Sequence, residues 1–119
     1  MKELFIGGRG FGAKLVWDNL VEHKFKVDPL GAENLLVVAP GPLTGAYLPS
    51  SGKCSFVAVS PATGIYGDSS IGGNFGIELR QAGIDALGIT GRAEVLSVLF
   101  VDDDEASIIP MPELAGKSC

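Results

Sequence analysis

Apolar side chains recur at helical spacing near the start of the chain. After the apolar segment at 4–6 and a glycine-rich stretch, they occupy positions i, i+3, i+4 and i+7, as Ala13, Val16, Trp17 and Leu20. This spacing places them on one face of a helix, so we expect an amphipathic helix over residues 10–21. We expect Trp17 to anchor the core under that helix.

Two apolar runs predict strands. The continuous run at 35–39 is rich in β-forming residues and is typical of a strand buried on both faces. Residues 53–59 alternate between apolar and smaller or polar side chains and predict a second strand. The segment between them, 40–52, holds three prolines and three glycines and is expected to be a loop.

A polar, glycine-rich segment at 67–74 precedes a second helical pattern. Phe75, Leu79 and Ala82 stand at helical spacing, so we expect a short helix here with Phe75 in the core. The segment at 67–74 is expected to be a loop that leads into the start of this helix.

The last third of the chain predicts strands. Residues 86–90 and 96–101 are expected to form the two strands of a hairpin that is joined through 91–94. Four consecutive acidic residues at 102–105 predict a solvated turn, and 107–109 a last strand.

Composition and charge restrict the class of protein. The chain has 119 residues, one domain's length, and its 46% hydrophobic residues exclude intrinsic disorder. A net charge of −5 without a basic stripe argues against binding to nucleic acid or to anionic membranes. No apolar run approaches the ~20 residues of a membrane span, so we expect a cytoplasmic protein.

Cysteine and histidine are scarce. Cys54 and Cys119 are the only cysteines and His23 the only histidine, so this chain alone provides neither a disulfide framework nor a four-ligand zinc or iron–sulfur site. Cys54 is expected in the core, because no base is placed to activate it. We expect His23 to interact with a helix end or with water. The sequence contains no recognisable catalytic set and no metal-ligand set.

A glycine motif near the N-terminus has the spacing of a dinucleotide fingerprint. It consists of Gly8, Gly10 and Ala13, but no acidic residue follows the next strand to hold a ribose. We therefore favour a tight turn that packs a helix against a sheet. A dinucleotide-binding α/β domain is kept as an alternative.

A second glycine-rich segment is the better candidate for a binding site. Glycines are 17 of 119 residues, more than twice the usual share, which indicates tight turns or a closely approached ligand. Gly72 and Gly73 would expose backbone N–H groups to an anion, Ser69 and Ser70 would add hydroxyls, and Lys53 would add a cation. A phosphate-bearing cofactor suits this set. The alternative, equally weighted on spacing alone, is that the serines and Asp68 cap a helix and that Lys53 is a solvated edge charge.

Several short sequence blocks carry a family resemblance in their order and spacing. They are GGRGFGAKL at 7–15, GPLTG at 41–45, SPATG at 60–64, GGNFGIEL at 72–79, AGIDAL at 82–87 and GRA at 91–93. Together they resemble the N-terminal domain of the aldehyde:ferredoxin oxidoreductase family over nearly the whole chain.

The resemblance implies an α+β, β-rich domain of sheets with short helices that carries a bis-pterin cofactor of tungsten or molybdenum. In that family, aldehydes are oxidised to carboxylic acids and electrons pass through a [4Fe-4S] cluster to ferredoxin. The cluster ligands and substrate pocket lie in later helical domains, so residues 1–119 are expected to be a partial N-terminal cofactor-binding domain, a fragment of a longer chain. The expected partners are the rest of that enzyme, ferredoxin, an aldehyde and a second copy in a homo-oligomer.

For the site, the resemblance implies contact with the phosphates of the pterin. The family usually has Arg where Lys53 stands and often Asn where Ser70 stands. Lys53 keeps the charge but loses the bidentate fork of Arg. The metal is expected to be held by the dithiolene sulfurs of the pterin, without a protein ligand from this chain. A second alternative is a non-catalytic, β-rich fragment or interaction module.

Overall fold

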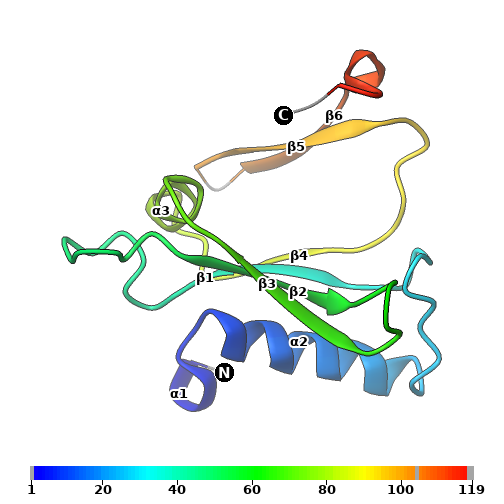
Figure 1. Cartoon of the computed structure of the whole chain (residues 1–119), viewed down its shortest axis with the longest axis horizontal. Helices are drawn as coiled ribbons and strands as arrows, with labels where there is room; N and C mark the ends of the chain where they lie inside the picture. The colour runs from blue at the N-terminus through cyan, green and yellow to red at the C-terminus, as the bar shows by residue number, and fades with distance from the viewer. Residues whose placement is uncertain (1, 104, 118–119) are drawn as a thin grey trace.

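The structure is a computed structural model that describes residues 2–103 and 105–117. Its centre is a four-stranded antiparallel sheet in the order β3-β2-β1-β4. The strands are β1 (Leu36–Pro40), β2 (Cys54–Val59), β3 (Tyr66–Ile71) and β4 (Leu87–Ile89). Figure 1 shows helices on both sides of this sheet, as expected for the predicted α+β class.

One face of the sheet is covered by the long helix α2 (Arg9–Glu22), which follows the short helix α1 (Lys2–Phe5) (Figure 1). Val37 of β1 and Val57 of β2 are completely buried here against Phe11 and Val16 of the helix. The predicted helix at 10–21 and both strands that flank the loop at 40–52 are therefore confirmed. In the part of the chain that the structure describes, no helix is both long and apolar enough to cross a membrane.

The opposite face carries α3 (Phe75–Gln81) and a separate hairpin of β5 (Ser97–Asp102) and β6 (Glu105–Pro110), followed by the 3-10 helix η1 (Pro112–Leu114). A smaller core of Val38, Cys54 and Leu79 lies on this side, and Val101 of β5 packs against it. Successive side chains in β1 and β2 thus enter two different cores, because neighbouring residues of a strand point to opposite faces. This explains why β1 is apolar throughout.

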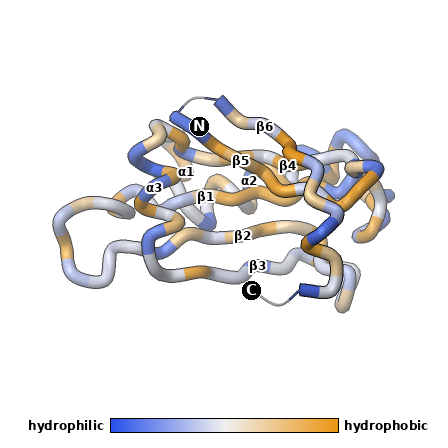
Figure 2. The backbone as a smooth tube through the Cα atoms, turned by 90° about the horizontal axis from the view of Figure 1, so that it is seen from above, coloured by the Kyte–Doolittle hydropathy of each residue, from blue (hydrophilic) through white to orange (hydrophobic). Residues whose placement is uncertain are grey.

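The prediction of a loop at 67–74 was wrong for most of its length. Residues 66–71 form β3, which pairs with β2 from Val59↔Tyr66 to Cys54↔Ile71. Its sequence, YGDSSI, lacks the apolar alternation of a strand because β3 is an edge strand whose side chains are mostly exposed. In Figure 2, β3 is mostly pale whereas β5 is largely orange, so β3 is the less hydrophobic of the two strands.

The predicted hairpin of 86–90 with 96–101 was also wrong, although both strands exist. β4 pairs with β1, through Leu36↔Ile89, and β5 pairs with β6. Alternation identifies strands but does not identify their partners, and the open edge of β1 is the partner that buries β4. The turn before the last strand is confirmed by the Asp102↔Glu105 pair. Asp104, which this prediction includes, and Cys119 lie outside the described residues.

Two aromatic residues predicted in the core lie at the surface. Trp17 is 57% exposed and packs edge-on against Phe25, with ring centroids 5.4 Å apart. Phe75 is 47% exposed and stacks on Phe56. The core contact expected from Trp17 is made instead by Phe11 and Val16, since the helix face that meets the sheet contains Gly12 and Val16.

Candidate functional site

The register of β2 and β3 brings Lys53 beside Gly72. The ladder ends at Cys54↔Ile71, and the residues that come next beyond the two strands are Lys53 and Gly72. The two segments remain adjacent beyond this point, because a Cβ at Gly52 would lie only 2.7 Å from the Gly73 carbonyl oxygen. Two segments that are about twenty residues apart in the sequence therefore form one end of the candidate site.

The two predicted serines lie on opposite faces of β3. Ser69 is opposite Phe56, which faces the α3 side, and Ser70 is opposite Ser55, which alternates onto the α2 side. The Cβ direction of Gly52 is toward Ile77 of α3, so alternation places the next residue, Lys53, on the α2 side with Ser70. A ligand on one face of the sheet can meet Ser70 and Lys53 together, but not both serines.

The Gly72–Gly73 turn is open to solvent. A Cβ at either glycine would have no heavy atom within 4 Å, and Gly73 has a φ of +86°, which side chains other than that of glycine rarely allow. Neither glycine N–H donates a hydrogen bond to another described residue. Lys53 is exposed and forms no ion pair with any residue between 4 and 103 or between 105 and 117. These groups are thus available to an anion.

An ion pair that the sequence analysis missed lies on the same side of the sheet. Arg9, the first residue of α2, has its Nε 2.7 Å from Oδ2 of Asp68 on β3. The alternative in which Asp68 and the two serines cap α3 was wrong, because the helix begins without a side-chain cap hydrogen bond. The sequence signal was a lone arginine between glycines at 7–12, but its partner becomes evident only once 66–71 is known to be a strand.

Two titratable groups on the paired strands β2 and β3 have shifted pKa values. Burial raises the pKa of the Tyr66 phenol, and the Asp68 charge raises it further while Arg9 opposes the shift. Burial also raises the pKa of the Cys54 thiol, against backbone hydrogen bonds of Ser55 and Ala39 that lower it. Cys54 is 0% exposed, so the prediction of a core cysteine is confirmed. Its thiol is neutral and shielded, which makes it a poor nucleophile.

The two other isolated motifs have structural roles. His23 ends α2, with Nδ1 2.9 Å from the Asn19 carbonyl oxygen, so it meets the helix end as expected. Of the glycine motif at 8–13, Gly8 lies in the turn before α2, where its N–H donates to the Pro40 carbonyl at 3.0 Å, and the other residues belong to the helix. The segment before it, including Phe5, is helical, and the central sheet is antiparallel, so the strand and parallel sheet of a dinucleotide fold are not found in the described residues.

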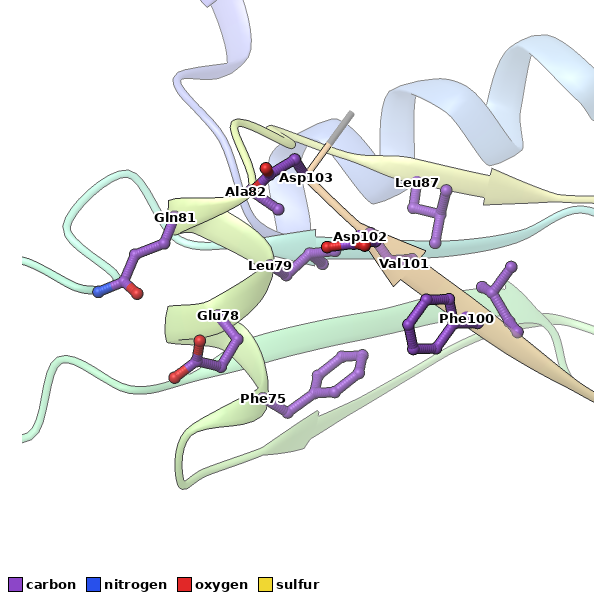
Figure 3. A pocket seen from close by; sticks show the side chains of 11 residues that line it. Phe75, Glu78, Leu79, Gln81, Ala82, Leu87, Phe100, Val101, Asp102 and Asp103 are labelled. Carbon is purple, nitrogen blue, oxygen red and sulfur yellow. The ribbon is translucent and has the colours of Figure 1, made fainter. Parts of the chain in front are cut away.

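Of two clefts in the described part of the chain, one includes a single predicted site residue and the other includes none. A cleft of about 490 Å³ lies between α3 and β5, where Phe75 and Leu79 point toward Phe100 and Asp102 (Figure 3). None of the five predicted site residues lines it. A second cleft, of about 460 Å³, lies between the loop at 45–52 and α3 and includes Gly73. Among the described residues, no group of three or more His, Cys, Asp or Glu could hold a metal ion.

Comparison with known proteins identifies relatives of the whole chain. Residues 1–119 match the family described as aldehyde ferredoxin oxidoreductase, N-terminal domain. A tungsten-containing aldehyde ferredoxin oxidoreductase of Thermococcus kodakarensis is 40% identical over 113 residues, which are 95% of this chain and 18% of the relative. The WOR-like subunit of an aliphatic sulfonate oxidoreductase of Pyrococcus furiosus is 45% identical over 105 residues, which are 87% of this chain and 16% of the relative.

A solved structure shows the same fold. The active-site complex BamBC of benzoyl coenzyme A reductase, in complex with 1,5-dienoyl-CoA, has a TM-score of 0.88 and 34% identity to this chain. The match covers 97% of this chain and 17% of that one. The chain therefore spans less than a fifth of the length of these relatives. It belongs to the aldehyde ferredoxin oxidoreductase family, and its 119 residues correspond to that family's N-terminal domain.

Proposed function

We propose that this chain is the cofactor-binding part of a tungstopterin oxidoreductase, and that residues 1–119 are a partial N-terminal domain of a longer enzyme. The observation that carries the proposal is the family match over the whole chain, together with two relatives that are named oxidoreductases. The whole enzyme would oxidise an aldehyde to a carboxylic acid, with water as the source of the added oxygen atom and with release of two electrons and two protons. The electrons would pass through a [4Fe-4S] cluster to ferredoxin, in the cytoplasm.

The cofactor, when bound, supplies the redox centre, with tungsten or molybdenum held by its dithiolene sulfurs. The residues of this chain supply binding and orientation. The fit rests on the open Gly72–Gly73 turn, whose glycine N–H groups have no acceptor among the described residues, and on the unpaired Lys53 beside it. These are donors that suit a phosphate group of the pterin.

Each predicted residue has a separate part in this proposal. Lys53 holds the phosphate through its ammonium group, and Ser70 donates its hydroxyl from the same side of the sheet. Gly72 and Gly73 donate backbone N–H groups. Ser69, on the α3 side, would be reached only by a part of the cofactor that passes around the edge of β3.

A titration of the isotope-labelled 119-residue chain with a phosphorylated pterin tests this proposal by NMR. We expect the amide signals of Gly72, Gly73 and Ser70 to shift in a saturable manner. The same pterin without its phosphate is the control and should leave these signals nearly unchanged. Equal shifts with both compounds, or none with either, would contradict a phosphate site here. In a full-length protein that contains this chain, elemental analysis should find tungsten or molybdenum.

A further inference from the structure

Arg9 lies on the same side of the sheet as the proposed phosphate site, although it belongs to a different part of the sequence. Its ion-pair partner, Asp68, is opposite Val57, and Ser70 is opposite Ser55. Asp68 and Ser70 are two residues apart in β3, so both point to the α2 side. The register therefore aligns Arg9, Ser70 and the segment of Lys53 along one edge of the molecule.

The Arg9–Asp68 pair leaves the guanidinium able to bind another group. The Arg9 side chain is 65% exposed, whereas that of Asp68 is 27% exposed, so the carboxylate is the more buried partner. A guanidinium has five N–H donors, and a carboxylate engages at most two of them in a bidentate pair. Asp68 thus fixes the orientation of the guanidinium, and further donors of Arg9 remain at the surface.

The spacing along the strands suits a ligand with extended negative charge. From Asp68 to Gly72 the chain advances four positions, about 13 Å at the rise of a strand. Arg9 is held at the first of these positions and Lys53 stands at the last, with Ser70 between them. Long side chains at both ends can reach inward to linked phosphates.

We propose that Arg9, oriented by Asp68, is a second cationic side chain of the anion site and binds the same phosphate-bearing ligand as Lys53. The inference rests on the proposed function, because it extends the site of Lys53, Ser70 and the Gly72–Gly73 turn. Arg9 would recognise a phosphate oxygen through its exposed N–H donors. The turn at Gly7 and Gly8 then has a functional consequence, since it sets the position of Arg9 at the start of α2.

The test is the affinity of the 119-residue chain for inorganic pyrophosphate, measured by isothermal titration calorimetry. Arg9→Gln should weaken binding about tenfold, because it removes a charge-assisted hydrogen bond. Arg92→Gln is the matched control, because this exposed arginine lies in the connection between β4 and β5. We expect the Arg92→Gln variant to bind pyrophosphate within about twofold of the affinity of the original chain. Arg9→Lys keeps the charge, should fold like the original chain and should show a smaller loss of affinity.

Asp68→Ala separates orientation from net charge. If only overall charge mattered, removing this carboxylate would strengthen anion binding. We expect binding to weaken by a few-fold, because Arg9 loses its orienting partner. Stronger binding would overturn the orienting role of Asp68. Circular dichroism at the titration temperature verifies that each variant is folded.

Lys53→Gln distinguishes failure of this inference from failure of the proposed site. If Lys53→Gln weakens binding and Arg9→Gln behaves like Arg92→Gln, the inference about Arg9 is wrong and the site stands. If the folded chain does not bind pyrophosphate, or if neither substitution weakens the binding, both the inference about Arg9 and the proposed site are wrong. Weakening by both Lys53→Gln and Arg9→Gln, and not by the control, supports both.

Discussion

Gly12 of α2 lies directly on Val57 of β2. A Cβ added to Gly12 would stand 2.4 Å from Cγ2 of Val57 and 2.9 Å from its Cβ, both too close for non-bonded atoms. Val57 is completely buried in an inner strand of the sheet. This contact therefore sets how closely the helix approaches the sheet, and with it the position of Arg9 above β3.

Gly12→Ala should lower the free energy of unfolding by about 1–3 kcal/mol, because the added methyl group overpacks the core. Urea denaturation followed by circular dichroism measures the change. In the background of Val57→Ala, Gly12→Ala should lower the free energy of unfolding by less, since the Cγ2 atom of residue 57 is gone. Part of the overlap remains, because the Cβ of residue 57 is still present. A coupling above about 0.5 kcal/mol is expected in this double-mutant cycle. Additive effects would show that the two residues do not restrict each other.

The two glycines of the candidate site should respond differently to alanine. Gly73→Ala places a side chain at a φ of +86° and should destabilise the chain by about 1–2 kcal/mol. Gly72→Ala is the matched control, because its Cβ would meet no atom within 4 Å and its φ is not in the left-handed region. We expect Gly72→Ala to stay within about 0.5 kcal/mol of the original chain. Equal losses in both variants would mean that backbone conformation is not the cause.

Alkaline pH should destabilise the fold. The pKa of Cys54 is raised by burial, so its unfolded thiol, with a pKa of about 8.5, ionises first. The free energy of unfolding that the neutral, buried thiol contributes is fully present below the pKa of the unfolded thiol. It is lost as the pH rises through the raised pKa of Cys54 in the folded chain. Tyr66, whose pKa is also raised, adds a loss above about pH 10. Denaturation between about pH 7.5 and pH 9.5 measures the first loss.

Cys54→Ala is the control for the pH dependence. This variant is expected to be less stable at every pH, because it removes buried volume, but its stability should change less between the two pH values. If the original chain and Cys54→Ala show the same pH dependence, the thiol is not responsible for it.

The β5–β6 hairpin should open more readily than the central sheet. It has two strands only, and Phe100 and Ile108 are 50% and 64% exposed. Two-stranded sheets are marginally stable alone, so its backbone amides should exchange with deuterium at least about tenfold faster than those of β1 and β2. Val101→Ala should accelerate exchange in the hairpin further, because Val101 packs on the core of Val38 and Leu79. Val98→Ala is the control, because Val98 is three residues from Val101 in β5 and therefore points to the other face of the hairpin.

Local pattern predicted most of the elements, and tertiary context decided the rest. The helix over 10–21 and the strand at 35–39 were predictable, since the first has apolar residues at helical spacing and the second is a continuous apolar run. β3 was not, because an edge strand is stabilised by backbone pairing with β2 and needs no apolar face. The exposure of Trp17 was not predictable either, because the helix turns Gly12 toward the sheet and thereby directs Trp17 away from it.

The candidate site was predictable in its residue types and not in its geometry. The glycine turn and Lys53 were evident from composition and from the family resemblance. The separation of Ser69 from Ser70 by the faces of β3, and the approach of Arg9 through Asp68, depend on the register of β2 with β3. That register follows from long-range pairing, which periodicity along one segment does not encode.

The affinity of the chain for a phosphorylated pterin, compared between the original sequence and Lys53→Gln, tests the central claim most directly. Lys26→Gln is the matched control, since it removes an exposed lysine beyond the opposite end of α2. We expect Lys53→Gln to weaken binding about tenfold or more, and Lys26→Gln to leave it within about twofold. Equal affinity of the original chain and the Lys53→Gln variant would contradict a phosphate site at this edge of the sheet.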